Sequence, residues 1–343
     1  MSDLHSKMYR EVREIPEAVD RLLNAGGGAI QSAAAALRER DPAFLVSVAR
    51  GSSDHVATYF KYASELLLGL PVASVGPSVA SVYKRPLKLG QGACIAISQS
   101  GQSPDIVEMM RMAQASGAPT VAITNDATSR LAAVSDHTLE LHAGPELSVA
   151  ATKTFVTSAV CALWLLAEWA EDHALLTALH RLPEALQHAV ALDWSAVGGA
   201  VRDDASLYCL GRGPSYAMSN EAALKFKEVC QIHAESYSSA EVLHGPVSIV
   251  GEAFPVLALT GQDAAEPVLT QVADKIAGKG ASVFVTSDTA RVAHALPAVR
   301  TGHPLTDPIT LIASFYTLVE GLAVARGMDP DAPRHLNKVT ETV

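Results

Sequence analysis

Two ten-residue stretches decide the fold of this chain: FLVSVARGSS at residues 44–53 and SLYCLGRGPS at residues 206–215. Each is a short apolar run that ends in Arg-Gly and leads into a helical pattern, which is typical of a strand, a loop and a helix. The two Arg-Gly pairs lie 162 residues apart (212 − 50 = 162). The same offset still joins matching residues as far along as Asp126 and Asp288. One offset held over such a distance predicts an internal duplication.

The pattern around both stretches predicts the fold class. Short apolar runs alternate with longer helical patterns in each copy, as in a parallel sheet that helices cover on both faces. We therefore expect an α/β protein made of two tandem, doubly wound parallel-sheet domains. The expected limits are residues 1–42 for N-terminal helices, 43–192 and 205–328 for the two domains, and 329–343 for a C-terminal tail.

The charge balance argues against one class of partner. Lys and Arg number 26 against 36 Asp and Glu, so the formal net charge is 26 − 36 = −10. An acidic chain binds polyanions poorly, which argues against nucleic acid as a partner. It does not exclude one small anion held in a local positive site.

Cysteine usage and hydropathy indicate the compartment. The four cysteines are far apart in apolar stretches, which predicts buried free thiols in a reducing environment: Cys94, Cys161, Cys209 and Cys230. The N-terminus has no apolar signal core, and the apolar stretch at residues 156–170 is too short to span a bilayer. We expect a soluble cytoplasmic protein with no membrane contact.

The clearest candidate binding loop is Ser98-Gln99-Ser100-Gly101-Gln102-Ser103, between an apolar run and a helical pattern that opens at Pro104. Ligands of open α/β sheets bind at the carboxyl ends of strands. Hydroxyls and backbone N–H groups at a helix N-terminus suit a phosphate dianion. The alternative is an ordinary Ser-rich turn in which a residue such as Ser103 only caps the helix.

Two further loops have a comparable place in the pattern. Arg50-Gly51-Ser52-Ser53 follows the first apolar run, and Val149-Ala150-Ala151-Thr152-Lys153 opens a long helical pattern. All three loops belong to the first copy, so they could converge on one anion. Other phosphate motifs fail: there is no G-x-x-x-x-G-K-[ST], and Tyr216 stands where GRGPSY would need the third glycine of a dinucleotide fingerprint. The twelve histidines contain no H-E-x-x-H, so we expect neither a metal nor an organic cofactor.

The second copy departs from the first. It has Thr260-Gly261-Gln262-Asp263 where the first has the Ser-rich loop, and the acid would repel phosphate. Its unusual residues are a helix with Glu221, Lys225 and Glu228 on one face, followed by a Ser-rich run with His233, Glu235, Glu241 and His244. A solvated ion-pair stripe would explain the helix alone. So many titratable groups near a phosphate cradle instead favour an acid–base site.

These motifs together resemble the SIS (sugar isomerase) domain family, in particular the tandem pair that forms the isomerase half of glutamine–fructose-6-phosphate aminotransferase. The resemblance runs from about residue 43 to the end and rests on ARGSS, ISQSGQSPD, VAATK, GRG, EAALKFKE, IHAES, EVLHGP and PRHLNKVTETV. It implies that the sugar phosphate is held by Ser98, Gln99, Ser100, Ser103, Ser52, Ser53, Val149 and Ala151, with Gly51 and Gly101 shaping their loops.

The resemblance also implies catalytic roles. Glu228 would move the proton between C1 and C2, with Lys225 as its partner on the helix. His244 would open the sugar ring and would reach in from a neighbouring subunit of a homodimer. Lys338 would cap the site and bond to an open-chain keto sugar.

Two departures from the aminotransferase matter. Ser2 follows Met1 where that enzyme has its nucleophilic cysteine, and about 40 helical residues stand where its glutaminase domain would be. Gln102-Ser103-Pro104 replaces the usual Glu-Thr, as in the amino-sugar-phosphate deaminase and isomerase branch. The expected reaction is conversion of glucosamine 6-phosphate to fructose 6-phosphate plus ammonia. The alternatives are the synthetic direction with ammonia, a fructosamine-6-phosphate deglycase, and a non-catalytic sugar-phosphate sensor.

Overall fold

The computed structural model describes residues 5–201 and 206–338, which form two compact units. The β1–β5 unit contains residues 17–146, 153–180 and the tail from Asn337. The β6–β10 unit contains the N-terminal residues up to Pro16, the short segment Leu147–Thr152, and Arg181–Leu336.

The β1–β5 unit is built on a five-stranded sheet with the order β2-β1-β3-β4-β5. All of its strand pairs are parallel. The central strands are almost fully buried, as expected for runs that are apolar on both faces. The strands are β1 (Phe44–Val48), β2 (Val72–Ser74), β3 (Gly92–Ile97), β4 (Thr120–Thr124) and β5 (His137–Glu140).

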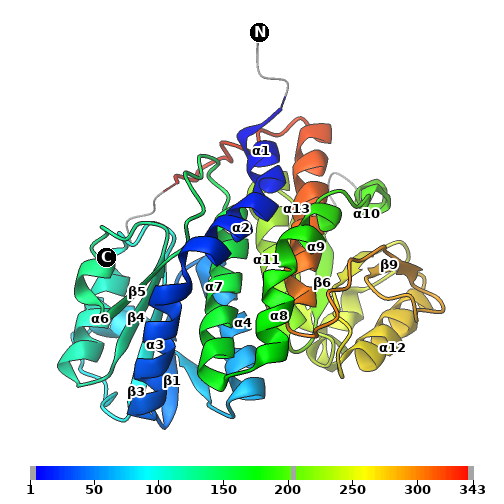
Figure 1. Cartoon of the computed structure of the whole chain (residues 1–343). Helices are drawn as coiled ribbons and strands as arrows, with labels where there is room; N and C mark the ends of the chain where they lie inside the picture. The colour runs from blue at the N-terminus through cyan, green and yellow to red at the C-terminus, as the bar shows by residue number, and fades with distance from the viewer. Residues whose placement is uncertain (1–4, 202–205, 339–343) are drawn as a thin grey trace. The chain divides into compact units, whose positions relative to one another are not determined.

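Helices cover both faces of this sheet. On one face α3 (Gly27–Arg40), α7 (Lys153–Ala170) and α4 (Ser52–Leu67) lie side by side (Figure 1). On the other, α6 (Pro104–Ala115) and α5 (Ser78–Ser81) close a core with every second residue of the central strands. The remaining helices are α2 (Ile15–Ala25), which begins in the other unit, α8 (His173–His180) and the 3₁₀ turn η1 (Ala132–Val134).

The β6–β10 unit is built on a second five-stranded parallel sheet, with the order β10-β9-β8-β6-β7. Its strands are β6 (Leu207–Gly211), β7 (Ala234–Ser238), β8 (Pro255–Ala258), β9 (Ser282–Val285) and β10 (His294–Ala295). The helix α12 packs with one face of the sheet, and α11 packs against α13. The helices are α1 (Lys7–Arg13), α9 (Leu182–Ala189), α10 (Ser195–Ala200), η2 (Glu241–His244), η3 (Pro246–Ile249), α11 (Pro214–Cys230), α12 (Glu266–Ala277) and α13 (Asp307–Ala325).

The two sheets confirm the predicted duplication. Read from the other end, the second order is β7-β6-β8-β9-β10, which matches β2-β1-β3-β4-β5. Helix α11 begins 162 residues after α4 (214 − 52), and α12 begins 162 residues after α6 (266 − 104). Gly51 and Gly213, which precede α4 and α11, share positive φ angles of 54° and 58°. The fold is therefore two parallel-sheet α/β copies, as the sequence indicates.

Smaller expectations are met in part. All four cysteines are free and buried, as expected. The described part of the region expected to hold N-terminal helices forms α1, α2 and α3, and Glu14 separates α1 from α2. Within the described residues, one helix, α13, is long and apolar enough to cross a membrane, and 78% of its apolar window is buried inside the structure.

Candidate functional site

The Ser-rich loop stands at the carboxyl end of β3 and folds back on itself. The Gly101 N–H donates to Ser98 Oγ at 3.2 Å, and the Gln102 N–H donates to Ser100 Oγ at 3.3 Å. Ser103 occupies the N-cap of α6 as expected, but its side chain makes no capping hydrogen bond. Pro104 supplies no N–H at the first helical position, and Asp105 Oδ1 accepts the N–H of Ile106 at 2.9 Å. Helix capping therefore does not explain the third serine.

An ion pair joins this loop to the Arg-Gly-Ser-Ser loop after β1. Arg50 Nε and Nη2 lie 3.0 and 2.6 Å from Asp105 Oδ2, on a carboxylate that is fully buried. Because β1 and β3 are neighbours and β2 lies on the far side of β1, this is the switch point of the sheet, where ligands of such folds bind. The β1–β5 unit thus brings together two of the three predicted phosphate loops. Ser52, Ser53, Gln99 and Ser100 are all partly exposed there.

The third predicted segment belongs to the other unit. Val149 and Ala151 lie in the segment Leu147–Thr152, which packs with the β6–β10 unit. The Val149 N–H donates to the Asp331 carbonyl oxygen at 3.2 Å. These two residues are therefore in the same unit as Glu228.

Lys338 belongs to the β1–β5 unit and is held there by Glu146, a residue that the sequence analysis did not identify. The Lys338 ammonium lies 2.9 Å from Glu146 Oε2. The Glu146 carboxylate is buried and also accepts the N–H and the hydroxyl of Thr154, at 3.1 and 2.7 Å. No helix or strand periodicity in the sequence points to Glu146, because its partners Thr154 and Lys338 lie 8 and 192 residues away along the chain. The sequence feature that could have indicated a role for Glu146 is its position in PELSVAATK, three residues before the predicted binding segment that begins at Val149.

The charged face of α11 is a buried cluster, so the reading as a fully solvated stripe is wrong. Glu221 and Lys225 are 0% and 1% exposed at their side chains, whereas Glu228 is 22% exposed. Lys225 Nζ lies 2.6 Å from Glu228 Oε2 and 3.1 Å from Glu221 Oε1. The Tyr316 hydroxyl on α13 donates to Glu221 Oε1 at 3.1 Å. Packing of α11 against α13 buries this face, and Glu228 alone among the three is accessible.

Burial and charge act in opposite directions on Lys225. Burial by itself disfavours the ammonium and lowers its pKa. The carboxylates of Glu221 and Glu228 outweigh burial and raise the pKa of Lys225 to about 12. Lys225 is therefore cationic at neutral pH.

The run of titratable residues after α11 does not form one cluster. His233 Nδ1 is 2.8 Å from Ser206 Oγ, and Glu235 Oε2 accepts the Tyr237 hydroxyl at 2.9 Å. His244 ends the 3₁₀ turn η2 and is exposed, in the same unit as Glu228.

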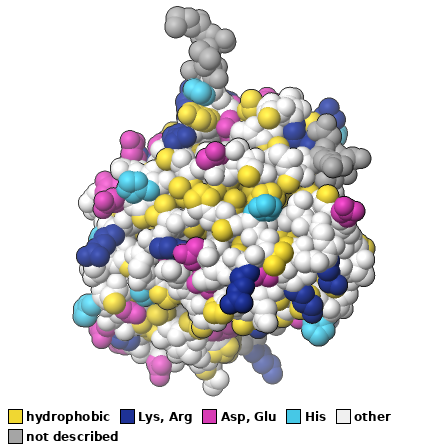
Figure 2. All heavy atoms as spheres, turned by 90° about the vertical axis from the view of Figure 1, so that its right-hand side faces the viewer, with side chains coloured by type: hydrophobic (Ala, Val, Ile, Leu, Met, Phe, Trp, Pro, Cys, Tyr) yellow, Lys and Arg dark blue, Asp and Glu magenta, His cyan; other side chains and the backbone are white. Residues whose placement is uncertain are grey.

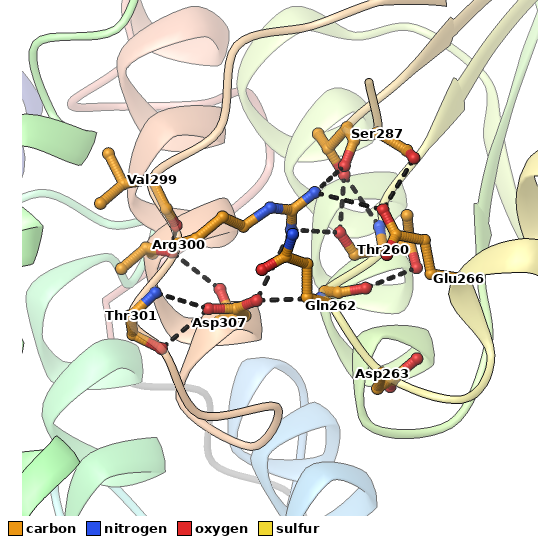
Figure 3. Close-up of polar contacts among 12 residues, drawn as sticks. Thr260, Gln262, Asp263, Glu266, Ser287, Val299, Arg300, Thr301 and Asp307 are labelled. Carbon is orange, nitrogen blue, oxygen red and sulfur yellow. Dashed lines mark hydrogen bonds and ion pairs between the residues drawn. The ribbon is translucent and has the colours of Figure 1, made fainter. Parts of the chain in front are cut away.

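The matching loop of the second copy is filled by its own side chains (Figure 3). The N–H of Gln262 donates to Asp307 Oδ2 at 2.9 Å, and the N–H of Gly261 donates to Ser215 Oγ at 3.2 Å. Arg300 donates to the carbonyl oxygens of Thr260 and Thr286, at 3.0 and 2.5 Å. The N–H groups of Gly261 and Gln262 are therefore engaged within the protein.

Two negative findings bear on ligands. Over residues 5–201 and 206–338, no three His, Cys, Asp or Glu side chains gather as a metal-binding group. On the face shown in Figure 2, the described Lys and Arg side chains lie among acidic and hydrophobic ones and form no continuous basic patch.

Known proteins share both halves of this architecture. The SIS domain family matches residues 44–168 and again residues 201–326. The isomerizing glutamine–fructose-6-phosphate aminotransferases of Symbiobacterium thermophilum and Sulfurisphaera tokodaii are 33% and 30% identical to this chain over 96% of its length. The chain spans only 58% and 56% of those two proteins, a little over half of each.

Solved structures agree with the sequence matches. A candidate phosphosugar isomerase from Silicibacter pomeroyi DSS-3 is 62% identical to this chain, with a TM-score of 0.92. The match covers 95% of this chain and 100% of that one. The C-terminal domain of glucosamine-fructose-6-phosphate aminotransferase from Francisella tularensis is 25% identical with a TM-score of 0.85, at 97% and 99% coverage of the two chains. Glucosamine-6-phosphate deaminase from Thermotoga maritima shares the fold, with 19% identity and a TM-score of 0.78 over 98% of this chain and all of that one. The chain therefore belongs to the SIS domain family and carries two SIS domains in tandem.

Proposed function

We propose that this protein is a phosphosugar isomerase that acts as a deaminase, converting glucosamine 6-phosphate and water to fructose 6-phosphate and ammonia. The observation that carries the proposal is the α11 cluster, in which two charged side chains are buried and Glu228 remains accessible. A buried charge pair is costly to the fold. Holding Glu228 in position as a base would explain why the protein keeps these buried charges.

The phosphate would be bound at the switch point of the β1–β5 unit. Its partners would be Gly51, Ser52, Ser53, Ser98, Gln99, Ser100, Gly101 and Ser103, with Val149 and Ala151 contacting the sugar. Arg50 is engaged by the buried Asp105, so it would shape this site more than it would neutralise the phosphate. The phosphate group takes no part in the chemistry and would serve to orient the reacting carbons.

Glu228 would be the general base. His244 would first open the pyranose ring by moving a proton between O1 and O5. Glu228 would then take the proton from C2 and return it at C1 by way of an enolamine, a transfer worth about 10²–10⁴-fold in rate. Water would hydrolyse the resulting C2 imine and release ammonia. Lys225, through its 2.6 Å contact with Oε2, would orient the Glu228 carboxylate.

Lys338 would act on the open-chain keto sugar, whose C2 carbonyl it could bond to or polarise. Its ammonium is held by Glu146, which would keep the tail of the chain over the site. A homodimer in the cytoplasm is the proposed form of the enzyme, with His244 supplied by the second subunit.

The synthetic direction is the second candidate, because the curated relatives are isomerizing aminotransferases. In this case fructose 6-phosphate and free ammonia would give glucosamine 6-phosphate. The same residues would act in reverse order.

The direct test is to offer glucosamine 6-phosphate and measure ammonia and fructose 6-phosphate together. We expect the two products in equal amounts, and their rate of formation should be at least ~10²-fold lower with Glu228→Gln. Fructose 6-phosphate with an ammonium salt tests the synthetic direction. Stoichiometric binding of both sugars without turnover in either direction would contradict the proposal and leave a sugar-phosphate sensor.

A further inference from the structure

Helix α1 carries a buried carboxylate, Glu11. It lies outside the two duplicated copies and has no role in the proposed reaction. It is 5% exposed, although it lies on a short helix outside both sheets. A buried carboxylate is destabilising unless hydrogen-bond donors surround it. The donors around Glu11 therefore show what the residue does.

Two consecutive backbone amides of the segment Leu147–Thr152 donate hydrogen bonds to Glu11. Glu11 Oε1 accepts the N–H of Leu147, and both carboxylate oxygens lie 3.3 Å from the N–H of Ser148. This segment carries Val149 and Ala151, the proposed sugar contacts, and has no regular secondary structure of its own. The carboxylate thus holds backbone that no sheet or helix ladder holds.

Asp331 completes the attachment from the other side. Its carboxylate accepts the N–H groups of Lys7 and Met8, at 2.7 and 2.8 Å, and so caps the start of α1. Its carbonyl oxygen accepts the N–H of Val149 at 3.2 Å. Three successive amides, at residues 147, 148 and 149, are therefore engaged by α1 and by the residue that anchors α1.

We propose that Glu11 is a positioning residue for phosphosugar binding, which fixes the backbone of Leu147–Thr152 so that Val149 and Ala151 meet the sugar. The inference rests on the proposed function for the role of these two residues. It gives α1 a part in the site although α1 supplies no group to the substrate. Losing Glu11 should weaken sugar binding more than it slows the chemical steps.

Amide exchange tests the attachment without any activity measurement. In Glu11→Gln the side-chain amide cannot accept all these bonds, so exchange at Leu147 and Ser148 should become about tenfold faster or more. The matched control is Glu17→Gln, which removes an exposed carboxylate at the start of α2 and should leave this peptide unchanged. Unchanged exchange in Glu11→Gln would overturn the inference.

Kinetics and binding test the consequence. Glu11→Gln should raise KM for glucosamine 6-phosphate about tenfold with kcat within threefold, and should weaken fructose 6-phosphate binding similarly in a thermal-shift titration. Glu11→Asp keeps the charge and should recover part of the loss. Faster exchange with an unchanged KM and unchanged binding would reduce Glu11 to a structural residue and refute its positioning role.

Failure of the proposed function would look different. A wild-type protein that binds fructose 6-phosphate but turns over no amino sugar contradicts the deaminase, while Glu11 is still judged by binding and exchange. A wild-type protein that binds no phosphosugar removes the inference as well. If Glu11→Gln does not fold, Asp331→Asn, which loosens the same attachment at Lys7 and Met8, replaces it with the same expected outcomes.

Discussion

Lys225 shows how burial and charge act together on one side chain. Lys225 is surrounded by protein, yet its ammonium persists because Glu221 and Glu228 lie 3.1 and 2.6 Å away. Glu221 is in turn held by the Tyr316 hydroxyl. Glu221 and Lys225 form the buried end of the cluster, and Glu228 is at its accessible end.

Replacing Glu228 by Gln should separate catalysis from folding. The amide keeps the size of the side chain but cannot take a proton, so we expect kcat to fall at least ~10²-fold, the low end for a lost general base. Lys225 still has Glu221, so the melting temperature should change little. Turnover and thermal denaturation measured on the same preparation check both statements, and near-normal turnover would return Glu228 to a purely structural ion pair.

The raised pKa of Lys225 predicts how stability depends on pH. The value rises from 10.5 to about 12 on folding. A group whose pKa is raised in the folded state stabilises it fully below the unfolded pKa and loses this contribution as pH rises through the folded pKa. The stabilisation should therefore be complete below pH 10.5 and should disappear between pH 10.5 and about 12.

Urea denaturation across that range measures the effect. The reference is the neutral variant Glu221→Gln, Lys225→Met, Glu228→Gln, which lacks the cluster but keeps the other groups that titrate at high pH. The free energy of unfolding of the wild type should fall more steeply than that of the variant. If the free energies of unfolding of the wild type and the variant fall in parallel with pH, the carboxylates do not raise the pKa of Lys225.

The Ser-rich loop shows how one element depends on close packing. Gly101 has a φ of 61°, and a Cβ added to it would lie 2.2 Å from Ser129 Oγ. Only glycine lets the loop approach Ser129 this closely. The loop is therefore shaped by a neighbour 28 residues away (129 − 101) as well as by its own sequence.

Comparing Gly101→Ala with Gly117→Ala separates the steric clash with Ser129 from the strain of a positive φ angle. Gly117 also has a positive φ, 80°, but nothing lies within 4 Å of an added Cβ. Both variants are strained by about 1 kcal/mol for the backbone conformation, and Gly101→Ala should be destabilised by a further ~1–3 kcal/mol from overpacking. Only Gly101→Ala should also raise KM. Equal losses of stability in the two variants would mean that the contact with Ser129 relaxes at no cost.

At the scale of the whole molecule, the duplication has produced two different copies from one fold. The first keeps hydroxyls and an open loop at the switch point. In the second, Asp307 and Arg300 fill the same place (Figure 3). Burial raises the pKa of Asp263 in that loop, and the nearby Glu266 and Asp307 add to the rise. The second copy instead carries the α11 cluster of Glu221, Lys225 and Glu228, to which the proposed function assigns the proton transfer.

Mixing two inactive variants tests the proposed sharing of His244. If each site combines Glu228 of one subunit with His244 of the other, Glu228→Gln and His244→Ala homodimers are both inactive. After subunit exchange, half of the dimers are mixed and each has one intact site, so roughly a quarter of wild-type activity should return. No recovery, with exchange verified by tagged subunits, would place both residues of a site on the same chain.

By itself, the amino-acid sequence determined the duplication, the parallel-sheet class, the loops after β1 and β3, and the free buried cysteines. The strands, loops and cysteines are local patterns of a few to twenty residues, which follow from strand and helix periodicity and from turn chemistry. The duplication is visible because the same local patterns recur at one constant offset. The SIS resemblance also pointed to Glu228, Lys225, His244 and Lys338. Their roles remain predictions.

Only the tertiary structure decided which polar groups are buried and what they bind. Glu221 and Lys225 have the same pattern as a solvated stripe until α13 covers them. Glu11 binds an amide 137 residues away, Glu146 binds Lys338 across 192 residues, and Arg300 reaches Thr260 across 40. The physical reason is that a buried charge persists only if folding brings it donors or an opposite charge, and no local pattern in the chain specifies partners that are so far apart.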